Sequence, residues 1–151
     1  MERVNSFKII GISIETTNED GRSAEDLAKL WGRFYDENIA AQIPNKENDE
    51  IYSIYTDYET DYKGKYTSMI GVKVNSLDII PNGLIGREFR GGNYTRFVAK
   101  GDMPDAVIKT WKEIWDKDNE LNRTYTADFE VYGTKSQNGK ESEVEIYIAV
   151  E

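Results

Sequence analysis

The spacing of apolar residues divides the chain into strand-like and helix-like segments. Alternation of apolar and polar side chains, rich in β-branched and aromatic residues, is typical of half-buried strands. It predicts strands at residues 7–16, 51–58, 66–74, 87–100, 124–132 and 142–150. Apolar residues at helical spacing predict one helix at about Ala24 to Ala41 and another at Pro104 to Lys117. The order is therefore strand, helix, strand, strand, followed by the same order again.

The repeated order indicates an internal duplication. The predicted units cover about residues 5–76 and 85–151, and Asp57-Tyr58-Glu59 in the first resembles Asp128-Phe129-Glu130 in the second. We expect a single domain, residues 1–151, with an α+β fold in which two β-α-β-β units are related by a pseudo-twofold axis. These units would form an antiparallel sheet with both helices on one face and a ligand groove on the other.

Alternation within a strand also assigns side chains to the two faces of the sheet. The apolar face of the last strand, expected beneath the helices, consists of Val144, Ile146, Ile148 and Val150. Tyr147 then points to the opposite face, where the groove is expected. Glu130 lies on a polar face of its strand, and the match with the earlier strand places Tyr55 on the same side. An exposed surface acid is the alternative interpretation of Glu130, because Glu is rarely buried.

The composition excludes several kinds of chemistry. The chain contains no Cys and no His, which removes disulfides, thiolate metal sites, a thiol nucleophile and an imidazole base. We therefore expect neither a metal nor a cofactor. The net charge of −9 repels phosphates and disfavours direct binding to nucleic acid. No apolar run reaches the length of a membrane span and no secretory signal is present, so we expect a cytoplasmic protein without membrane contact.

Several short motifs, taken in order and spacing, resemble the GyrI-like family, also called AraC-type effector-binding domains. They are Leu30-Trp31 with Phe34, Ile51 to Glu59, Tyr66 to Gly71, Gly92 to Phe97, Trp111 with Ile114-Trp115, Arg123 with Asp128 to Tyr132, and Ile146 to Ile148. The resemblance spans nearly the whole chain and is closest to stand-alone effector-binding proteins, some of them connected with mobile gene cassettes. Fused regulators of this family carry an additional helix-turn-helix, which we do not expect here because only six residues precede the first predicted strand.

The resemblance implies a groove that binds aromatic, often cationic, compounds. A glutamate of the second unit would supply the counter-charge, and Glu130 is the residue that matches it. Tyr147 matches a ring-bearing position next to this acid. The remaining candidates for the groove are Tyr55, Trp111, Tyr94 and Met69. Packing in the core is the alternative interpretation of Trp111, because it belongs to an apolar helical stripe.

Three functions are compatible with these residues. The first is a binding module for amphipathic aromatic cations, since a carboxylate among aromatic rings selects charged over neutral ligands. The second, implied by other family members, is a hydrolase of strained electrophilic natural products in which Glu130 activates water and Tyr147 or Tyr55 donates a proton. The third is a protein partner that inhibits a DNA-handling enzyme such as gyrase. We favour the binding module, because a chain without His has a narrow catalytic repertoire.

Overall fold

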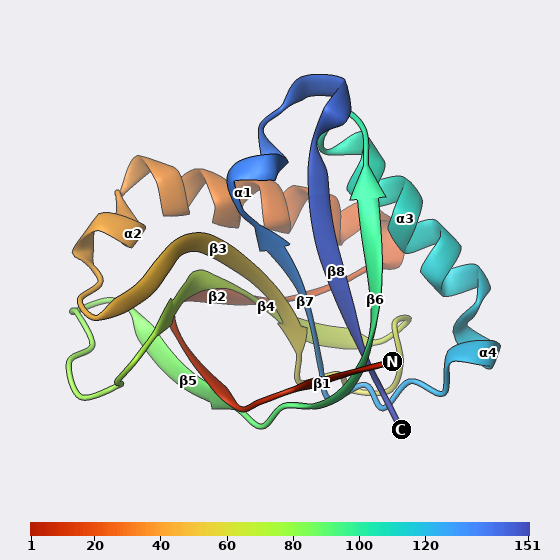
Figure 1. Ribbon diagram of the computed structural model, residues 1–151, viewed down its shortest axis with the longest axis horizontal. Coiled ribbons are helices and arrows are strands. Elements are labelled where there is room, and N and C mark those ends of the chain that lie inside the picture. Colours follow the sequence, from red (N-terminus) through yellow and green to blue (C-terminus); the bar gives the residue numbers. More distant parts are fainter.

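The computed structural model describes residues 1–151 and consists of one eight-stranded sheet with helices along one side (Figure 1). The strands are β1 (Glu2–Val4), β2 (Phe7–Thr17), β3 (Lys46–Thr56), β4 (Lys65–Val74), β5 (Ile85–Phe89), β6 (Gly92–Lys100), β7 (Ala127–Tyr132) and β8 (Glu143–Val150). The helices are α1 (Arg22–Asp36), α2 (Ile39–Gln42), α3 (Asp105–Asp116) and α4 (Asp118–Leu121). The α+β class predicted from the sequence is confirmed, and none of the helices is long and apolar enough to span a bilayer.

The strand order shows the duplication directly. Across the sheet the order is β1-β6-β8-β7-β3-β4-β2-β5, and neighbouring strands are antiparallel. The order β6-β8-β7 in the second unit is the reverse image of β3-β4-β2 in the first. β3 and β7 lie side by side at the centre, so the two units meet as a pseudo-twofold arrangement requires. The predicted duplication is confirmed.

The motif that suggested the duplication does not mark equivalent positions. Asp128 and Glu130 lie within β7, whereas β3 ends at Thr56, before the similar motif begins. Asp57 has a positive φ of 52° and starts the turn towards β4. Its carboxylate accepts two hydrogen bonds from the guanidinium of Arg87, at 2.7 and 3.1 Å. The predicted strand end at Tyr58 is therefore wrong, because the backbone leaves the extended conformation at Asp57.

Both predicted helices are present, but the first one is interrupted. α1 ends at Asp36 and α2 begins at Ile39. Between them Asn38 adopts a left-handed backbone with φ of 49°, which ends a right-handed helix. The second helix agrees with its prediction to within one residue at each end.

Apolar side chains cover both faces of the sheet. On the helix side, α1 and α3 each cover a separate cluster, so the apolar core is divided along the seam between the two units. The predicted apolar face of β8 is confirmed, because Val144, Ile146 and Ile148 pack beneath α3. On the opposite face the sheet curls around a third cluster, which is rich in aromatic rings. Its rings are those of Phe7, Tyr52, Phe89, Tyr94 and Phe129.

The predicted strand 87–100 is split into β5 and β6, and Gly91 lies in the break. Gly91 has φ of 76°, and a Cβ at this position would come within 2.3 Å of the carbonyl oxygen of Val4. Only glycine allows this approach without a clash. The close contact lets the segment that joins β1 to β2 pass along the lower side of the curled sheet in Figure 1.

Candidate ligand-binding groove

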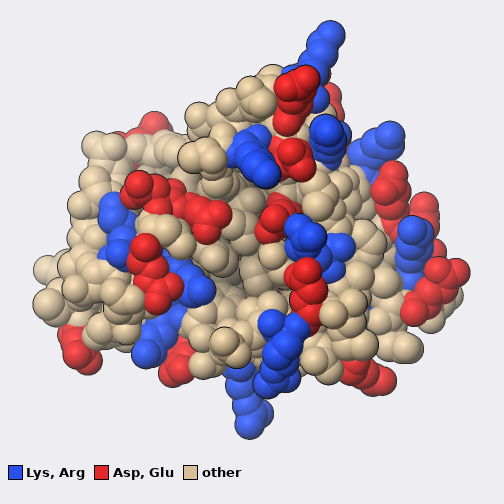
Figure 2. Space-filling model, viewed as in Figure 1, with Lys and Arg blue, Asp and Glu red and all other residues tan.

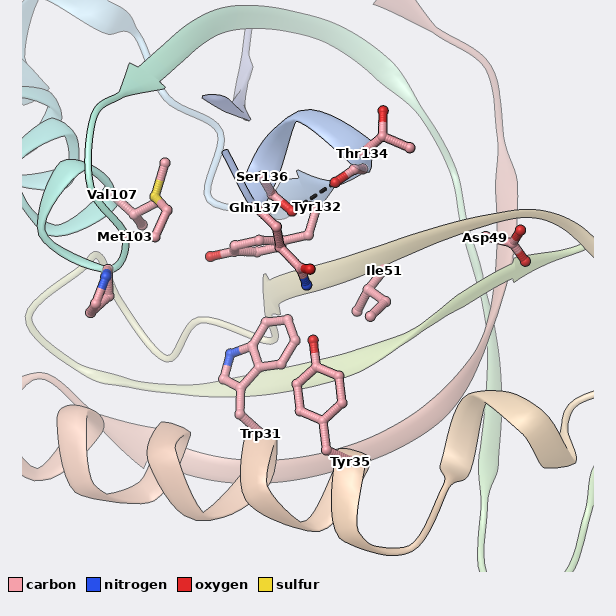
Figure 3. A pocket seen from close by; sticks show the side chains of 12 residues that line it. Trp31, Tyr35, Asp49, Ile51, Met103, Val107, Tyr132, Thr134, Ser136 and Gln137 are labelled. Atoms are coloured by element: carbon pink, nitrogen blue, oxygen red, sulfur yellow. Dashed lines mark hydrogen bonds between the residues drawn. The ribbon is translucent and has the colours of Figure 1, made fainter. Parts of the chain in front are cut away.

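A groove of ≈ 510 Å³ opens between α1 and α3, above the centre of the sheet (Figure 3). Figure 3 shows the rings of Trp31 and Tyr35 pointing from α1 towards Ile51 on β3 and Tyr132 on β7. The rings of Trp31 and Tyr132 meet edge to face, with centroids 5.0 Å apart. Val107 on α3 lines the other side. The volume lies within the range of about 300–1,000 Å³ that holds drug-sized ligands.

Glu130 lies beneath the floor of this groove and is 1% exposed. Its Oε1 accepts a hydrogen bond from the hydroxyl of Tyr132 at 2.5 Å. Its Oε2 accepts one from the indole Nε1 of Trp111 at 2.6 Å and one from the hydroxyl of Tyr55 at 2.8 Å. None of the ion pairs in the structure involves Glu130. The buried carboxylate is therefore held by neutral donors alone, and the interpretation of Glu130 as an exposed acid is wrong.

Burial determines the protonation chemistry of this group. It raises the pKa of Glu130, and the hydrogen bonds from Tyr132, Trp111 and Tyr55 lower that pKa only in part. Burial and the nearby charge of Glu130 also raise the pKa values of Tyr55 and Tyr132. Both hydroxyls therefore remain protonated and act as donors to the carboxylate.

Three elements from both units bring these donors together. Tyr132 follows Glu130 on β7, Trp111 comes from α3, and Tyr55 comes from β3 across the seam between the units. The ring of Tyr55 also packs edge-on against Trp111, with centroids 5.4 Å apart. Both Tyr55 and Trp111 were expected near Glu130 from the sequence, and the structure places them there.

Strand register explains why Glu130 faces the helices. Glu130 is paired with Ile146 of β8, and Phe129 is paired with Tyr147. Directly opposite residues of an antiparallel pair point to the same face. Glu130 thus shares the helix-covered face with Ile146. The expectation that Glu130 faces away from the helices, in a groove on the opposite side, is wrong.

The same register separates Tyr147, Tyr94 and Met69 from Glu130. All three lie on the opposite face, in or against the aromatic cluster. The ring of Tyr147 stacks on Phe129 with centroids 4.8 Å apart. The hydroxyl of Tyr94 donates to the carbonyl oxygen of Ala127 at 2.8 Å, and Met69 is fully buried. The expectation that these residues surround Glu130 is therefore corrected by the pairing of β7 with β8.

Asp128, two residues before Glu130, is also fully buried but has a charged partner. Its Oδ2 accepts hydrogen bonds from Arg123 at 2.8 Å and from the hydroxyl of Tyr58 at 2.6 Å. Its Oδ1 accepts one from the backbone amide of Ala149 at 2.8 Å. Burial raises the pKa of Asp128, and Arg123 opposes this effect. The carboxylate of Asp128 is thus neutralised within the chain.

The loop between β3 and β4 covers the far end of the space between the helices. Tyr62 in this loop stacks on Trp115 at the end of α3, with centroids 5.6 Å apart and an angle of 11°. The side chain of Asn18, which precedes α1, donates to the carbonyl oxygen of Tyr62 at 2.9 Å. Access to Glu130 is therefore expected from the open end, past Trp31 and Tyr132.

Sequence reasoning did not select Trp31 and Tyr132 as groove residues. Trp31 belongs to an apolar helical stripe, for which packing in the core is the usual interpretation. A comparison of the two units offers the missing signal, since Trp31 precedes Phe34 in the first helix as Trp111 precedes Ile114 in the second. Tyr132 stands two positions after Glu130 and therefore on the same face. The alternation of side chains along the strand was therefore sufficient to predict Tyr132 as a groove residue.

The groove between the two helices has the size of a small-molecule site, and comparisons with known proteins identify an effector-binding family. The sequence matches Cass2, the family of integron-associated effector-binding proteins, over residues 1–150. The integron cassette protein VCH_CASS2 from the mobile metagenome of Vibrio cholerae is 30% identical, with a TM-score of 0.79 over 99% of this chain and 94% of that one. YobU of Bacillus subtilis strain 168, a candidate transcriptional regulator, is 30% identical over 146 residues, which are 95% of this chain and 91% of YobU.

A further solved structure, SAV2435 bound to tetraphenylphosphonium, has a TM-score of 0.81 at 24% identity, over 99% of this chain and 92% of that one. The chain belongs to the Cass2 family of integron-associated effector-binding proteins. The resemblance to GyrI-like effector-binding domains noted in the sequence is thereby confirmed. The general function of this protein is the binding of a small-molecule effector.

Proposed function

We propose that the effector is an amphipathic aromatic cation and that Glu130 is its counter-charge. The observation that carries this proposal is the state of Glu130, which is 1% exposed, accepts hydrogen bonds from neutral donors and has no basic partner. A buried charge is costly unless it is paired. A cation that enters the groove supplies the partner that the chain does not.

The surroundings of Glu130 favour a cation that carries aromatic or apolar groups. Tyr132, Trp31, Trp111 and Tyr55 place aromatic rings on the path to the carboxylate and around it. A cation over such a ring gains about 0.5–2 kcal/mol, and its apolar groups gain from leaving water. SAV2435, which has the same fold, binds tetraphenylphosphonium, a permanently charged cation with four aromatic rings. The chemistry proposed for this chain is of that class.

Entry requires movement of Tyr132 in this proposal. The open groove is lined by Tyr132, whereas Glu130 lies behind it. The hydroxyl of Tyr132 holds Glu130 at 2.5 Å, and its ring contacts Trp31. Rotation of the Tyr132 ring would bring the cation into range of the carboxylate while the ring remains part of the wall.

Isothermal titration with tetraphenylphosphonium tests this proposal. Replacement Glu130→Gln keeps the size of the side chain and removes the charge. We expect it to weaken binding of the cation by roughly tenfold to a hundredfold, equivalent to about 1–3 kcal/mol. Binding of the neutral triphenylphosphine oxide should change much less, because it depends on apolar contacts.

Asp49→Asn is the matched control, because Asp49 lines the open groove but is exposed. An exposed acid is screened by solvent, so this variant should alter the affinity for the cation by less than about threefold. Equal affinity of wild type and Glu130→Gln for the cation would overturn the assignment of Glu130. Equal losses in Asp49→Asn and Glu130→Gln would show that general acidity, not a buried counter-charge, attracts the ligand.

A further inference from the structure

A second hollow, of ≈ 200 Å³, lies on the other face of the sheet, at the mouth of the aromatic cluster. Its walls and rim include Phe7, Tyr52, Phe129, Tyr147, Glu50 and Glu145. In β7, Val131 lines this hollow while the adjacent Tyr132 lines the helix groove. The sheet itself therefore separates the two cavities. Figure 2, viewed as Figure 1, shows a face hollowed near its centre, with acidic and basic side chains around the depression.

Aromatic rings form the interior of this hollow. Phe7 meets Phe129 edge to face at 5.2 Å, and Phe129 stacks on Tyr147 at 4.8 Å. Tyr52 packs against Phe7 and Phe129, with centroids 6.1 and 5.8 Å apart. These contacts fix the rings in place before any ligand arrives. A preformed aromatic wall is the feature by which proteins recognise quaternary ammonium groups.

The charges at the rim leave one carboxylate without a basic partner. Glu145 is paired with Arg96 at 3.2 Å. Lys73, which also lines the hollow, is paired with Glu47 at 3.6 Å. Glu50 lines the hollow and takes part in none of the ion pairs. The rim therefore carries an uncompensated negative charge next to aromatic rings.

The tyrosines of the hollow respond to these acids. Burial, and then the charges of Glu50, Glu47 and Glu145, raise the pKa of Tyr52 to about 12. Burial and a hydrogen bond donated to Glu145, at 2.9 Å, raise the pKa of Tyr147 as well. Burial disfavours a charge of either sign, but the contributions of Glu50, Glu47 and Glu145 reflect a negative local potential. That potential favours a positive charge.

We propose that this hollow is a second ligand site, which takes a small organic ammonium ion of the trimethylammonium type. The methyl groups of the ion would contact the rings of Tyr52 and Tyr147, and Glu50 would balance its charge. The volume of ≈ 200 Å³ is below the range of about 300–1,000 Å³ that suits multi-ring ligands, so the two sites would differ in the size of cation they accept. This proposal does not depend on the function proposed for the helix groove.

Choline and its neutral isostere 3,3-dimethylbutan-1-ol are the probes, titrated by calorimetry into the full chain and its variants. Glu50→Gln should weaken choline binding by roughly tenfold, while the neutral alcohol should bind weakly to every variant. Glu88→Gln is the matched control, because Glu88 is exposed, lines neither cavity and takes part in none of the ion pairs. It should change the affinity for choline by less than about threefold.

Glu130→Gln separates this site from the helix groove and should leave choline binding unchanged. A loss of choline binding in Glu130→Gln but not in Glu50→Gln would place the ammonium ion in the groove and overturn the proposal. Equal losses in Glu88→Gln and Glu50→Gln would mean attraction to general surface charge and would also overturn it. So would equal affinity for choline and the neutral alcohol, or the absence of measurable choline binding to the wild-type protein.

Discussion

Asp128 and Glu130 are two buried acids on the same strand, and the chain treats them in different ways. Asp128 has Arg123 at 2.8 Å, together with a hydroxyl and a backbone amide, and is 0% exposed. Glu130 is 1% exposed and is held by two hydroxyls and an indole, with no cation. The difference suggests that the first acid belongs to the scaffold and that the second is reserved for a ligand.

The positions of the two acids agree with this division. The Arg123 side chain is 1% exposed and also contacts Asp118 at 3.2 Å, which ties the segment after α3 to β7. Glu130, in contrast, stands behind Tyr132, which lines an open groove. A charge compensated within the chain strengthens the fold, whereas a charge compensated from outside gives affinity and selectivity.

The largest predicted effect is a difference in stability between two variants, each of which replaces a buried carboxylate by the amide of the same size. Asp128→Asn should lower the free energy of unfolding by about 3–5 kcal/mol, because it leaves Arg123 buried without a counter-charge. Glu130→Gln should change it by less than about 1 kcal/mol or increase it, because the charge that it removes has no partner. Urea unfolding of both variants at neutral pH measures the difference.

Two further results sharpen that comparison. In a double-mutant cycle, Arg123→Met should lower the free energy of unfolding much less in the Asp128→Asn background than in the wild type.

The pH dependence of stability gives the second result. Burial raises the pKa of Glu130 in the folded protein, so protonated Glu130 stabilises the fold. This stabilisation is fully present below the unfolded pKa and is lost as pH rises through the folded pKa. The stability of Glu130→Gln relative to wild type should therefore increase with pH. Equal destabilisation by Asp128→Asn and Glu130→Gln would contradict the distinction between the two acids.

The second prediction concerns the pH dependence of cation binding. A bound cation favours the ionised carboxylate, so affinity should fall as pH falls through the pKa of Glu130. Because that pKa is raised, the decline should begin above the ordinary Glu value of about 4.3. Well below this pKa, the affinity for the cation should fall by about tenfold for each pH unit. Tetraphenylphosphonium is a suitable probe, because its own charge does not titrate.

Titrations from about pH 8 to about pH 4 should show this decline for the wild type and a flat profile for Glu130→Gln. Asp49→Asn should follow the wild-type profile. A wild-type affinity that stays constant over the whole range would be inconsistent with a titrating counter-charge in the groove.

Much of the fold could be predicted from the sequence because local periodicity reports it. The apolar face of β8, the helical stripes and the repeated element order all depend on spacing along the chain. The break after Asp36 could not be read in this way, because the left-handed backbone of Asn38 leaves no periodic signal. The short strand β1 was missed as well, since three residues are too few to show alternation.

The sequence predicted some residues of the site correctly, but it predicted the wrong face of the sheet for Glu130. Alternation placed Tyr55 on the side of Glu130, and the structure joins the two by a hydrogen bond at 2.8 Å. Alternation alone could not tell which face of β7 meets the helices, because that choice depends on which residues of β8 are paired with it. The pairing of Phe129 with Tyr147 reverses the expected arrangement. Tyr147 therefore faces the second hollow and not the groove.

The smallest predicted effect tests the role of Tyr132 as the restraint on Glu130. Tyr132→Phe keeps the ring in the groove wall and removes the hydroxyl that holds Oε1 at 2.5 Å. The carboxylate is then less stabilised in the free protein, and the ring can move without breaking a charged hydrogen bond. Affinity for tetraphenylphosphonium should rise by about threefold to tenfold, since part of the roughly 1.5–3 kcal/mol of such a bond is recovered by water.

A second readout distinguishes this restraint from a direct contact with the ligand. The hydrogen bond from Tyr132 lowers the pKa of Glu130, so its removal should move the pH midpoint of cation binding upwards. Tyr35→Phe is the matched control, because Tyr35 lines the same groove, is 53% exposed and does not contact Glu130. It should change neither affinity nor midpoint. Weaker binding in Tyr132→Phe with an unchanged midpoint would mean that the hydroxyl contacts the ligand itself. It would contradict the role of Tyr132 as a restraint on Glu130.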